Sequence, residues 1–463
     1  MINETHIKRS AEKLAVKLSS TLGDSRVLVD PDVLEHFSRD KSHCNGVMPN
    51  LAVRAKNEDE IATILKFSAE FGVPVIARGA GTGKAGGAIP VYGGLVLDLT
   101  QMTDVLEVDA ENLLTVVQPG IVTGNLQALL EGEGLFYPPD PNSLETCTIG
   151  GNVAHNAGGP RAFKYGVTRE YVMGLRAVLM NGDVISPGKR TVKGVAGYDL
   201  TGLMVGSEGT LGVFSQITLK LVRQPVTRTT LLIPMPNEES AGVAVSKIVA
   251  AGLVPMVLEF MDSFIVSVLR SKGISGIAET TGALILAEID GDDEMSVERD
   301  TLRLAEICET AGADEILMAR HGGEREKLWA ARRIMSEAVA ETAKYKVSED
   351  IVVPRAAAPR LLMGLKTLSA RHKVQVASYG HAGDGNYHVN VLWNADDFEV
   401  TPVLRDVFEL TLALGGTITG EHGVGIAKRA YLPMEQSPSL IALQRSIKHV
   451  LDPLDLLNPG KIF

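Results

Sequence analysis

Two histidines on a predicted hairpin have the residue type and spacing to bind a metal ion. Residues 374–392 read as two strands joined by an Asp-Gly pair at 384–385, the strongest short signal for a two-residue type I′ turn. That turn would place His381 directly opposite His388 on one face, with their Cβ atoms about 4.5–5.5 Å apart. Asn390, two residues beyond His388, would share the face.

A metal ion would explain why the two imidazoles are so close. They repel each other when both are protonated, whereas a divalent cation holds both neutral and ligating. A histidine pair on a sheet is more often structural, so a third ligand is needed. The segment GEHGVG at 420–425 offers Glu421, with His422 beside it. These two neighbours can serve one site only where the backbone bends, and the flanking glycines permit a bend.

A predicted helix carries groups suited to a carboxylate. Apolar residues recur with helical periodicity from Glu324 to Tyr345, and Arg332 and Ser336, four apart, share one face. Arginine binds a carboxylate through two hydrogen bonds, and a hydroxyl can add another. Taken alone, the pair is more typical of a solvated helix face.

A glycine-rich loop at residues 78–87, RGAGTGKAGG, follows the predicted strand VPVIAR. Gly81, Gly83 and Gly86 match G-x-G-x-x-G, which is a weak signal alone. The next segment, AIPVYGGLVLDL, predicts a strand, not the helix that a dinucleotide fingerprint must open. Backbone N–H groups of such a loop can still converge on a diphosphate. The alternative is a flexible connection between strands.

Further glycine-rich segments complete a recognisable pattern. RGAGTG, PPDP, GGNVAHNAGG at 150–159 and GSEGTLGV at 206–213, in that order, resemble the FAD domain of the vanillyl-alcohol oxidase (PCMH) superfamily. The whole chain, with its tail LDPLDLLNPGKIF, resembles the group formed by the glycolate oxidase D-subunit, D-lactate dehydrogenase and D-2-hydroxyglutarate dehydrogenase.

The resemblance implies an FAD site in the first half of the chain and the tail. The implied contacts are Arg78, Gly79, Ala80, Gly81, Thr82, Gly83, Pro139, Ser143, Gly151, Asn156, Gly206, Gly209, Val213 and Asn458. Some members of the superfamily attach FAD covalently through His or Cys. In this chain His155 is the candidate for such a bond, and we expect it to line the FAD pocket without a covalent link.

The resemblance also implies a metal site. Its ligands are His381, His388 and Glu421, which leave coordination positions open for a substrate. Zinc is the first expectation, and manganese or iron(II) would also suit these ligands.

Arg332 and Ser336 correspond to substrate carboxylate contacts in the group. Related enzymes often place a lysine shortly afterwards, before an acidic-apolar-proline stretch. Here Ser348 takes that position, and Lys346 lies two residues before it. This departure leaves open whether the substrate has a second carboxylate.

The expected reaction oxidises a small D-2-hydroxy acid, such as D-lactate or glycolate, by hydride transfer from C2 to flavin N5. Arg332 would bind the C1 carboxylate, and the metal would bind the 2-hydroxyl and lower its pKa. His422 would take the proton as general base, with Asn390 nearby. A D-2-hydroxyglutarate-type dehydrogenase, a flavin-free metal-dependent hydrolase and a non-catalytic FAD-binding or assembly subunit are the alternatives.

The implied fold is α+β: a PCMH-type two-subdomain FAD-binding domain with an α+β cap domain. The expected boundaries are 1–45 for a helical lead-in, 46–224 for the FAD domain, 225–415 for the cap and 416–463 for a tail that completes the FAD domain. A chain of 463 residues with 45% apolar residues is long enough for two or three domains. The substrate would bind between flavin and cap.

Composition narrows the partners and the compartment. A net charge of −11 without Lys/Arg runs argues against nucleic acid and anionic membranes. Three separated cysteines argue against a disulfide framework. There is no signal-peptide h-region and no apolar run of about 18 residues, so we expect a cytoplasmic protein without a membrane span.

The electron acceptor is not named by the sequence. An electron-transfer flavoprotein, an iron–sulfur subunit or a quinone would each serve, and an iron–sulfur relay would have to lie on another chain because no cysteine cluster exists here. Direct oxidase activity, a homodimer and peripheral docking onto a membrane partner are left open.

Overall fold

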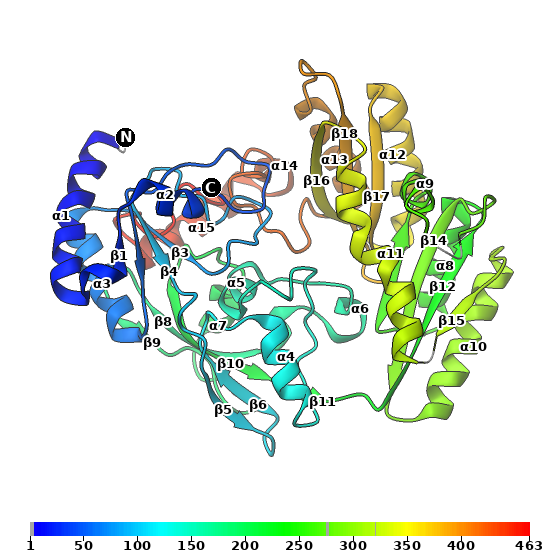
Figure 1. Ribbon diagram of the computed structural model, residues 1–463, viewed down its shortest axis with the longest axis horizontal. Helices are drawn as coiled ribbons and strands as arrows, with labels where there is room; N and C mark the ends of the chain where they lie inside the picture. Colours follow the sequence, from blue (N-terminus) through cyan, green and yellow to red (C-terminus); the bar gives the residue numbers. More distant parts are fainter. Residues whose placement is uncertain (1–3, 275–276, 320) are drawn as a thin grey trace. The chain divides into compact units, whose positions relative to one another are not determined.

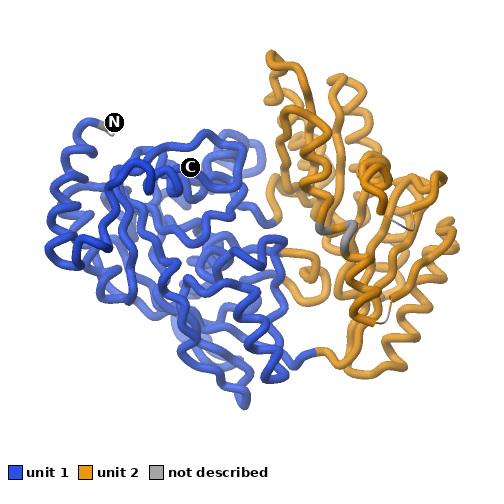
Figure 2. Tube along the Cα trace, viewed as in Figure 1, with its two compact units in different colours: residues 1–158, 167–224, 421–463 blue, residues 159–166, 225–420 orange. Residues whose placement is uncertain are grey.

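The computed structural model describes residues 4–274, 277–319 and 321–463, which form two compact units (Figures 1 and 2). Unit 1 takes in the residues up to Gly158, then Val167–Gln224 and Glu421–Phe463. Unit 2 consists of Gly159–Gly166 and Pro225–Gly420. Among the described residues, no helix is long and apolar enough to cross a membrane.

Unit 1 contains a small sheet that ends at the glycine loop. Its strand order is β1-β2-β4-β3, with β1 antiparallel to β2 and the other pairs parallel. The strands are β1 Val27–Leu28, β2 Leu51–Arg54, β3 Val75–Arg78 and β4 Leu95–Asp98. No helix lies between β3 and β4, as the sequence predicts, so the loop connects two strands of one sheet.

Helices α1 (Glu4–Leu22) and α3 (Glu58–Phe71) pack against this sheet. Asn57 caps α3 by accepting a hydrogen bond from Glu60 N at 2.9 Å. The reciprocal bond of a capping box is absent from the described hydrogen bonds, because Glu60 Oε2 accepts from Lys56 N instead. Ile61, Ile64 and Leu65 form the buried face.

A second, antiparallel sheet of unit 1 has the order β5-β6-β10-β8-β9. Its strands are β5 Val105–Asp109, β6 Leu114–Val117, β8 Val172–Val178, β9 Val184–Ile185 and β10 Val213–Lys220, and β7 Leu135–Phe136 pairs separately with β11 Val222–Arg223. The remaining helices of unit 1 are α2 Pro31–Leu34, α4 Thr123–Glu131, α5 Ile149–His155, α7 Leu200–Met204, α14 Leu432–Glu435 and α15 Pro438–Leu451.

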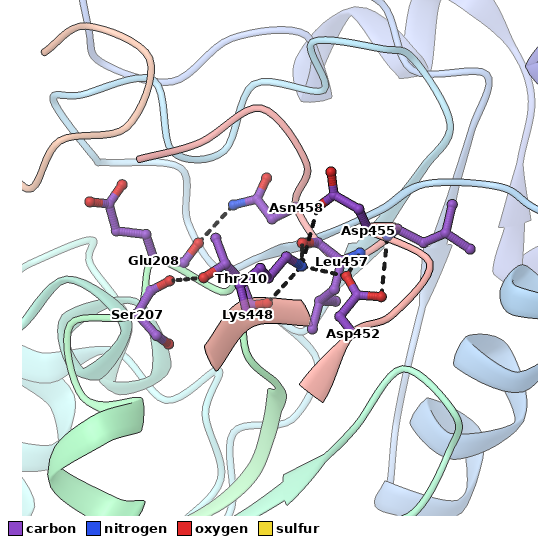
Figure 3. Close-up of polar contacts among 9 residues, drawn as sticks. Ser207, Glu208, Thr210, Lys448, Asp452, Asp455, Leu457 and Asn458 are labelled. Atoms are coloured by element: carbon purple, nitrogen blue, oxygen red, sulfur yellow. Dashed lines mark hydrogen bonds and ion pairs between the residues drawn. The ribbon is translucent and has the colours of Figure 1, made fainter. Parts of the chain in front are cut away.

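The C-terminal tail joins the first sheet and belongs to the same unit as the glycine loop. Val75 of β3 donates to Leu456 O and accepts from Asn458 N, both at 2.7 Å. Figure 3 shows how the tail is held: Lys448 Nζ donates to Thr210 O at 2.9 Å and to Leu457 O at 2.8 Å, and pairs with Asp452.

Unit 2 is built on one antiparallel sheet of order β15-β12-β14-β13-β17-β18-β16. Its strands are β12 Thr227–Met235, β13 Val257–Met261, β14 Ala283–Gly291, β15 Leu317–Ala319, β16 Tyr345–Val352, β17 Gln375–His381 and β18 Asn386–Trp393. Strands β13, β17 and β18 are buried almost throughout, so both faces of the sheet are covered.

Two groups of helices cover the sheet of unit 2 (Figure 1). Helices α9 (Ser263–Ser271) and α11 (Gly322–Ala340) pack on each other and on one face, where Met261, Met335 and Tyr379 share an apolar core. Helices α8 (Glu238–Ala250), α10 (Glu294–Thr310) and α12 (Ala358–His372) pack against the sheet as a second group, with α13 (Thr401–Ala413) on α12. Short α6 (Ala162–Tyr165) also belongs to unit 2.

The helix predicted from Glu324 to Tyr345 is shorter than expected. Helix α11 ends at Ala340, and Tyr345 begins strand β16. The prediction was wrong at this end because the apolar positions around Tyr345 also fit the alternation of a strand. Pairing with β18 along all eight residues of β16 decides in favour of the strand.

Candidate active site

The glycine loop of unit 1 surrounds a buried guanidinium. Arg78, the last residue of β3, is 5% exposed, and its Nη2 donates to His36 O at 3.3 Å. Gly81 has a φ of +68°, and a Cβ placed on it would lie 2.2 Å from Arg78 Nη2. Arg78 Nη1 is buried without a hydrogen-bond partner in the described part of the chain. A buried cation with a donor to spare fits an anionic group such as a diphosphate.

The other glycine-rich segments of unit 1 meet this loop. A Cβ on Gly79 would lie 2.2 Å from Oγ1 of Thr148, which caps α5, so the loop touches the start of that helix. Gly206 N donates to Val153 O at 2.9 Å, which joins the segment 206–213 to α5. Asn458 Nδ2 donates to Gly87 O at 3.0 Å and to Glu208 O at 2.7 Å, and its buried Oδ1 lacks a partner among the described residues.

The other residues expected to contact FAD lie on these same segments. Asn156 ends α5 with a φ of +51°, and Gly206 and Gly209 also have positive φ. Pro139 and Ser143 belong to the loop that leads into α5, where Pro139 O accepts from Gln127 Nε2 at 2.8 Å. The remaining members are Ala80, Thr82 and Gly83 of the glycine loop, Gly151 of α5, and Val213, the first residue of β10.

His155 lies where three glycines approach one another. An added Cβ would come within 2.8 Å of its ring at Gly87, 3.5 Å at Gly423 and 3.6 Å at Gly83. Its Nδ1 is 3.2 Å from Gly151 O, and its Nε2 is buried with no partner within the described ranges. The ring therefore packs against both the glycine loop and the segment that carries His422.

The segment 421–425 bends, as its glycines predict. Gly423 and Gly425 have φ of +80° and +49°, and His422 Nε2 lies 3.8 Å from Glu421 Oε1, so the two side chains are neighbours. Glu208 holds the bend, because its buried carboxylate accepts from Val424 N at 2.8 Å and Gly425 N at 2.7 Å. The sequence analysis missed this role of Glu208, although the residue lies within the GSEG motif.

The histidine hairpin of unit 2 has a different register from the predicted one. His381 pairs with Asn386 and His388 pairs with Tyr379, so the histidines are diagonal and not directly opposite. The turn spans four residues, Ala382 to Gly385, and only Gly385 has the positive φ that a type I′ turn requires at both central positions. The expectation of a shared face holds, and the two ring centroids are 5.3 Å apart.

Three side chains can supply one metal ion with ligands. They are the predicted residues: His381 on β17 and His388 on β18 of unit 2, and Glu421, which follows unit 2 directly in the chain. Glu421 directly follows Gly420, whose N donates to Asp350 of β16 and whose Cα has no room for a side chain beside Asn386. Two imidazoles and a carboxylate form a donor set that suits zinc, manganese or iron(II).

Glu259 of β13 connects His381 to Arg332. One carboxylate oxygen contacts His381 Nδ1 and the other contacts Arg332 Nε. Burial alone would raise the pKa of Glu259, but the positive charge of Arg332 and the hydrogen bonds from His381 and Arg332 lower it well below its usual range. The sequence analysis missed Glu259, because an isolated acidic residue in the strand VLEFM shows no partner until the sheet is assembled.

The predicted carboxylate contacts lie on α11, over this same face. Arg332 is 5% exposed, and its guanidinium lies 5.4 Å from the centroid of the Tyr379 ring. Ser336 is half-buried and accepts from Lys346 Nζ at its carbonyl (2.9 Å) and its hydroxyl (3.3 Å). Ser348 pairs with Asn390, so Ser348 and Lys346 both lie on the face of the histidines.

Asn390 is fully buried on that face, two residues beyond His388. Its Nδ2 donates to His388 O at 3.0 Å, and its Oδ1 has no hydrogen-bond partner among the residues described. A buried amide oxygen without a partner is costly. It therefore suits a donor group from a ligand.

Comparison with known families assigns the chain. A model described as "FAD binding domain" matches residues 49–187, and one described as "FAD linked oxidases, C-terminal domain" matches residues 224–462, more than half of the sequence. The chain belongs to the FAD-linked oxidases. The two matches fall on the segments that carry the glycine loop and the histidine hairpin.

Several curated relatives of this FAD-linked oxidase match it along almost the whole chain. Glycolate oxidase subunit GlcD of Bacillus subtilis (strain 168) is 42% identical over 90% of this chain and 89% of its own length. D-lactate dehydrogenase of Anaerostipes hadrus is 36% identical over 95% of both chains. D-2-hydroxyglutarate dehydrogenase of Stutzerimonas stutzeri (strain A1501) is 31% identical over 96% of this chain and 98% of its own.

A solved structure of p-cresol methylhydroxylase with bound substrate has the same fold. Its TM-score is 0.81 at 16% sequence identity, and the match covers 98% of this chain and 96% of that one. The expected fold class, a PCMH-type FAD-binding fold in an α+β chain, is thereby confirmed. This FAD-linked oxidase is an FAD-dependent oxidoreductase whose relatives are named for hydroxy acids.

The geometry of the glycine loop predicts how FAD binding can be lost. In Gly81→Val, a side chain would have to occupy the space of the Arg78 guanidinium in a backbone conformation that valine rarely adopts. The purified variant is expected to be colourless, whereas Gly72→Ala, at an open helix end with a similar φ, should keep its flavin. The measurement is the FAD-to-protein absorbance ratio, and a full complement of flavin in Gly81→Val would show that the loop does not hold the cofactor.

Proposed function

We propose that this enzyme oxidises a small D-2-hydroxy acid, of the D-lactate or glycolate type, to the 2-oxo acid. The main support for this proposal is a buried face of the unit 2 sheet. It brings together His381, His388, Asn390 and Arg332. Such a face offers a cation, an amide and metal ligands to an α-hydroxy carboxylate. The glycolate oxidase subunit and D-lactate dehydrogenase among the relatives support this substrate class.

Unit 1 contributes the cofactor site in this proposal. The segments that meet at the glycine loop hold FAD, with Arg78 beside its diphosphate and Asn458 fixing the neighbouring segments. FAD, when bound, supplies the acceptor for the hydride from C2 of the substrate. His155 packs against the glycine loop as a non-covalent neighbour of the cofactor.

Unit 2 contributes the groups that bind and orient the acid. Arg332 binds the C1 carboxylate, because a guanidinium held by a buried anion keeps a fixed orientation. Ser336 and Asn390 supply hydrogen bonds to the same ligand. His381, His388 and Glu421 hold a divalent metal, zinc in the first place, which would bind the 2-hydroxyl and lower its pKa.

His422 is the proposed general base. It lies on the bent segment 421–425, next to a metal ligand and against the segments that bind FAD. Its imidazole takes the hydroxyl proton while the C2 hydride leaves. Electrons then pass to an external acceptor: an electron-transfer flavoprotein, an iron–sulfur subunit or a quinone.

A D-2-hydroxyglutarate-type activity is the second candidate, and one observation favours it. Lys346 lies on the face of the histidines and contacts Ser336, which places a positive charge beside a proposed carboxylate contact. The relative named D-2-hydroxyglutarate dehydrogenase supports the same possibility. The number of carboxylates that the site accepts is therefore the point on which the two candidates differ.

A turnover screen tests both candidates. Purified enzyme is mixed with an artificial electron acceptor and with D-lactate, L-lactate, glycolate, D-malate or D-2-hydroxyglutarate, and the 2-oxo acid is identified as product. The proposal expects D-lactate or glycolate to give the highest kcat/KM. A preference for D-2-hydroxyglutarate that disappears in Lys346→Met would establish the second candidate, and no turnover with any 2-hydroxy acid would refute both.

A further inference from the structure

One buried carboxylate of unit 2 touches two groups to which the proposed function gives different tasks. Glu259 lies on β13 in register with His381 of β17, and its side chain is completely buried. Its Oε1 contacts Nδ1 of His381, a proposed metal ligand, and its Oε2 contacts Nε of Arg332, the proposed carboxylate contact. Both carboxylate oxygens of Glu259 therefore contact side chains of the proposed active site.

We propose that Glu259 is a positioning residue that aligns the metal-binding nitrogen of His381 and the guanidinium of Arg332 at the same time. The inference rests on the proposed function. It assigns Glu259 no contact with substrate or cofactor, and it states that metal affinity and substrate affinity depend on one carboxylate.

The histidine contact has a defined consequence for metal binding. A carboxylate accepts a hydrogen bond only from a protonated nitrogen, so Nδ1 of His381 carries the proton and Nε2 presents its lone pair. The carboxylate also fixes the plane of the ring and makes the imidazole a stronger ligand. Because Glu259 is fully buried, bulk water has no access to take its place.

The arginine contact fixes the direction of the guanidinium. With Nε bound to Glu259 and the group 5.4 Å from the Tyr379 ring centroid, Arg332 has its position set from two sides. An isolated buried Arg332 would be costly, and an isolated buried Glu259 equally so. Removing the carboxylate should therefore displace Arg332 as well as His381.

A purely structural role is the competing explanation, and the chain offers a matched control for it. Glu288 of β14 is also buried, and it also ties α11 to the same sheet, because it accepts a hydrogen bond from Trp329 Nε1 of α11 at 3.0 Å as well as one from Thr230 of β12. It contacts neither histidine in the described hydrogen bonds. Glu288→Gln therefore measures the structural effect of removing a buried carboxylate beneath α11, without any effect on His381.

The test measures Zn²⁺ affinity of FAD-loaded enzyme by competition with a chelator, and records the absorption of the Co²⁺-substituted protein. Glu259→Gln, which keeps an acceptor oxygen without the charge, should bind Zn²⁺ about 10–100-fold more weakly than wild type. Glu259→Ala should bind it more weakly still, and both should change the Co²⁺ spectrum and raise KM for the acid. Glu288→Gln should leave Zn²⁺ affinity, Co²⁺ spectrum and KM unchanged.

The outcomes separate this inference from the function on which it rests. If wild type binds no Zn²⁺, Mn²⁺ or Fe²⁺, the proposed metal chemistry and the role of Glu259 both fail. If wild type binds Zn²⁺ and folded Glu259→Gln binds it equally well, only the positioning role is overturned. Equal weakening in Glu288→Gln overturns it too, because the effect would then be general. Should Glu259→Ala fail to fold, Glu259→Gln decides alone.

Discussion

His388→Ala is expected to lose its bound metal and keep its FAD. The variant removes one of two imidazoles from a three-ligand set, and two ligands hold a divalent ion poorly. The FAD-binding segments belong to unit 1, whereas His388 lies on β18 in unit 2, so the flavin content should not change. Flavin reduction by the acid should slow by on the order of 10³-fold, since a metal contributes several kcal/mol of charge stabilisation.

The measurement pairs elemental analysis with single-turnover flavin reduction. His372→Ala is the matched control, because that histidine also lies in unit 2 but ends α12 and pairs with Asp406 at 2.8 Å. It should retain metal and rate. Wild-type protein that contains no metal and is indifferent to chelators would remove the metal from the account.

His422→Ala should keep both metal and FAD and still reduce its flavin slowly. Loss of a general base costs roughly 10²–10⁴-fold in the rate of the step that it assists. The neighbouring variant Glu421→Gln should behave differently, with weaker metal binding that excess metal partly offsets. The two proposed roles fall on neighbouring side chains, since His422 Nε2 lies 3.8 Å from Glu421 Oε1 at the start of the bent segment.

Stopped-flow reduction with saturating acid distinguishes these roles. Added imidazole should restore part of the rate in His422→Ala, where the cavity can admit a free base, and none in Glu421→Gln. A His422→Ala enzyme that reduces its flavin at the wild-type rate would leave the metal as the sole activator of the hydroxyl.

The sequence predicted the structure correctly where residues close together in the chain determine it. The glycine loop leads into a strand and not into a helix, and Gly423 bends the segment after His422. Each of these outcomes depends on residues a few positions apart. The same is true of the four glycine motifs, whose order along the chain indicated the PCMH-type fold.

The predictions of the hairpin turn and of the helix end were wrong because contacts between distant segments of the chain determine the structure there. Asp-Gly favours a two-residue turn, but Gly383 N donates to Leu258 O of the neighbouring strand and the turn widens to four residues. Tyr345 follows the helical periodicity, yet pairing with Trp393 draws it into the sheet. Local sequence patterns do not reveal which strands pair when the partners lie more than 40 residues apart in the chain.

The two residues that the sequence analysis missed show the same limit. Glu208 and Glu259 are buried acidic groups with hydrogen-bond partners that lie 216 and 122 residues away in the chain. A buried carboxylate within a motif or strand predicts only that some partner exists. Which partner it has follows from the assembled fold.

Anaerobic titration of the purified yellow enzyme with D-lactate and glycolate, followed at the flavin absorption band, tests whether the enzyme oxidises these acids. At least one of the two acids is expected to bleach the band, with one 2-oxo acid formed for each FAD reduced, whereas L-lactate is not. Flavin that stays oxidised with D-lactate, glycolate, D-malate and D-2-hydroxyglutarate, in protein that contains its metal, would contradict the proposed oxidation of D-2-hydroxy acids.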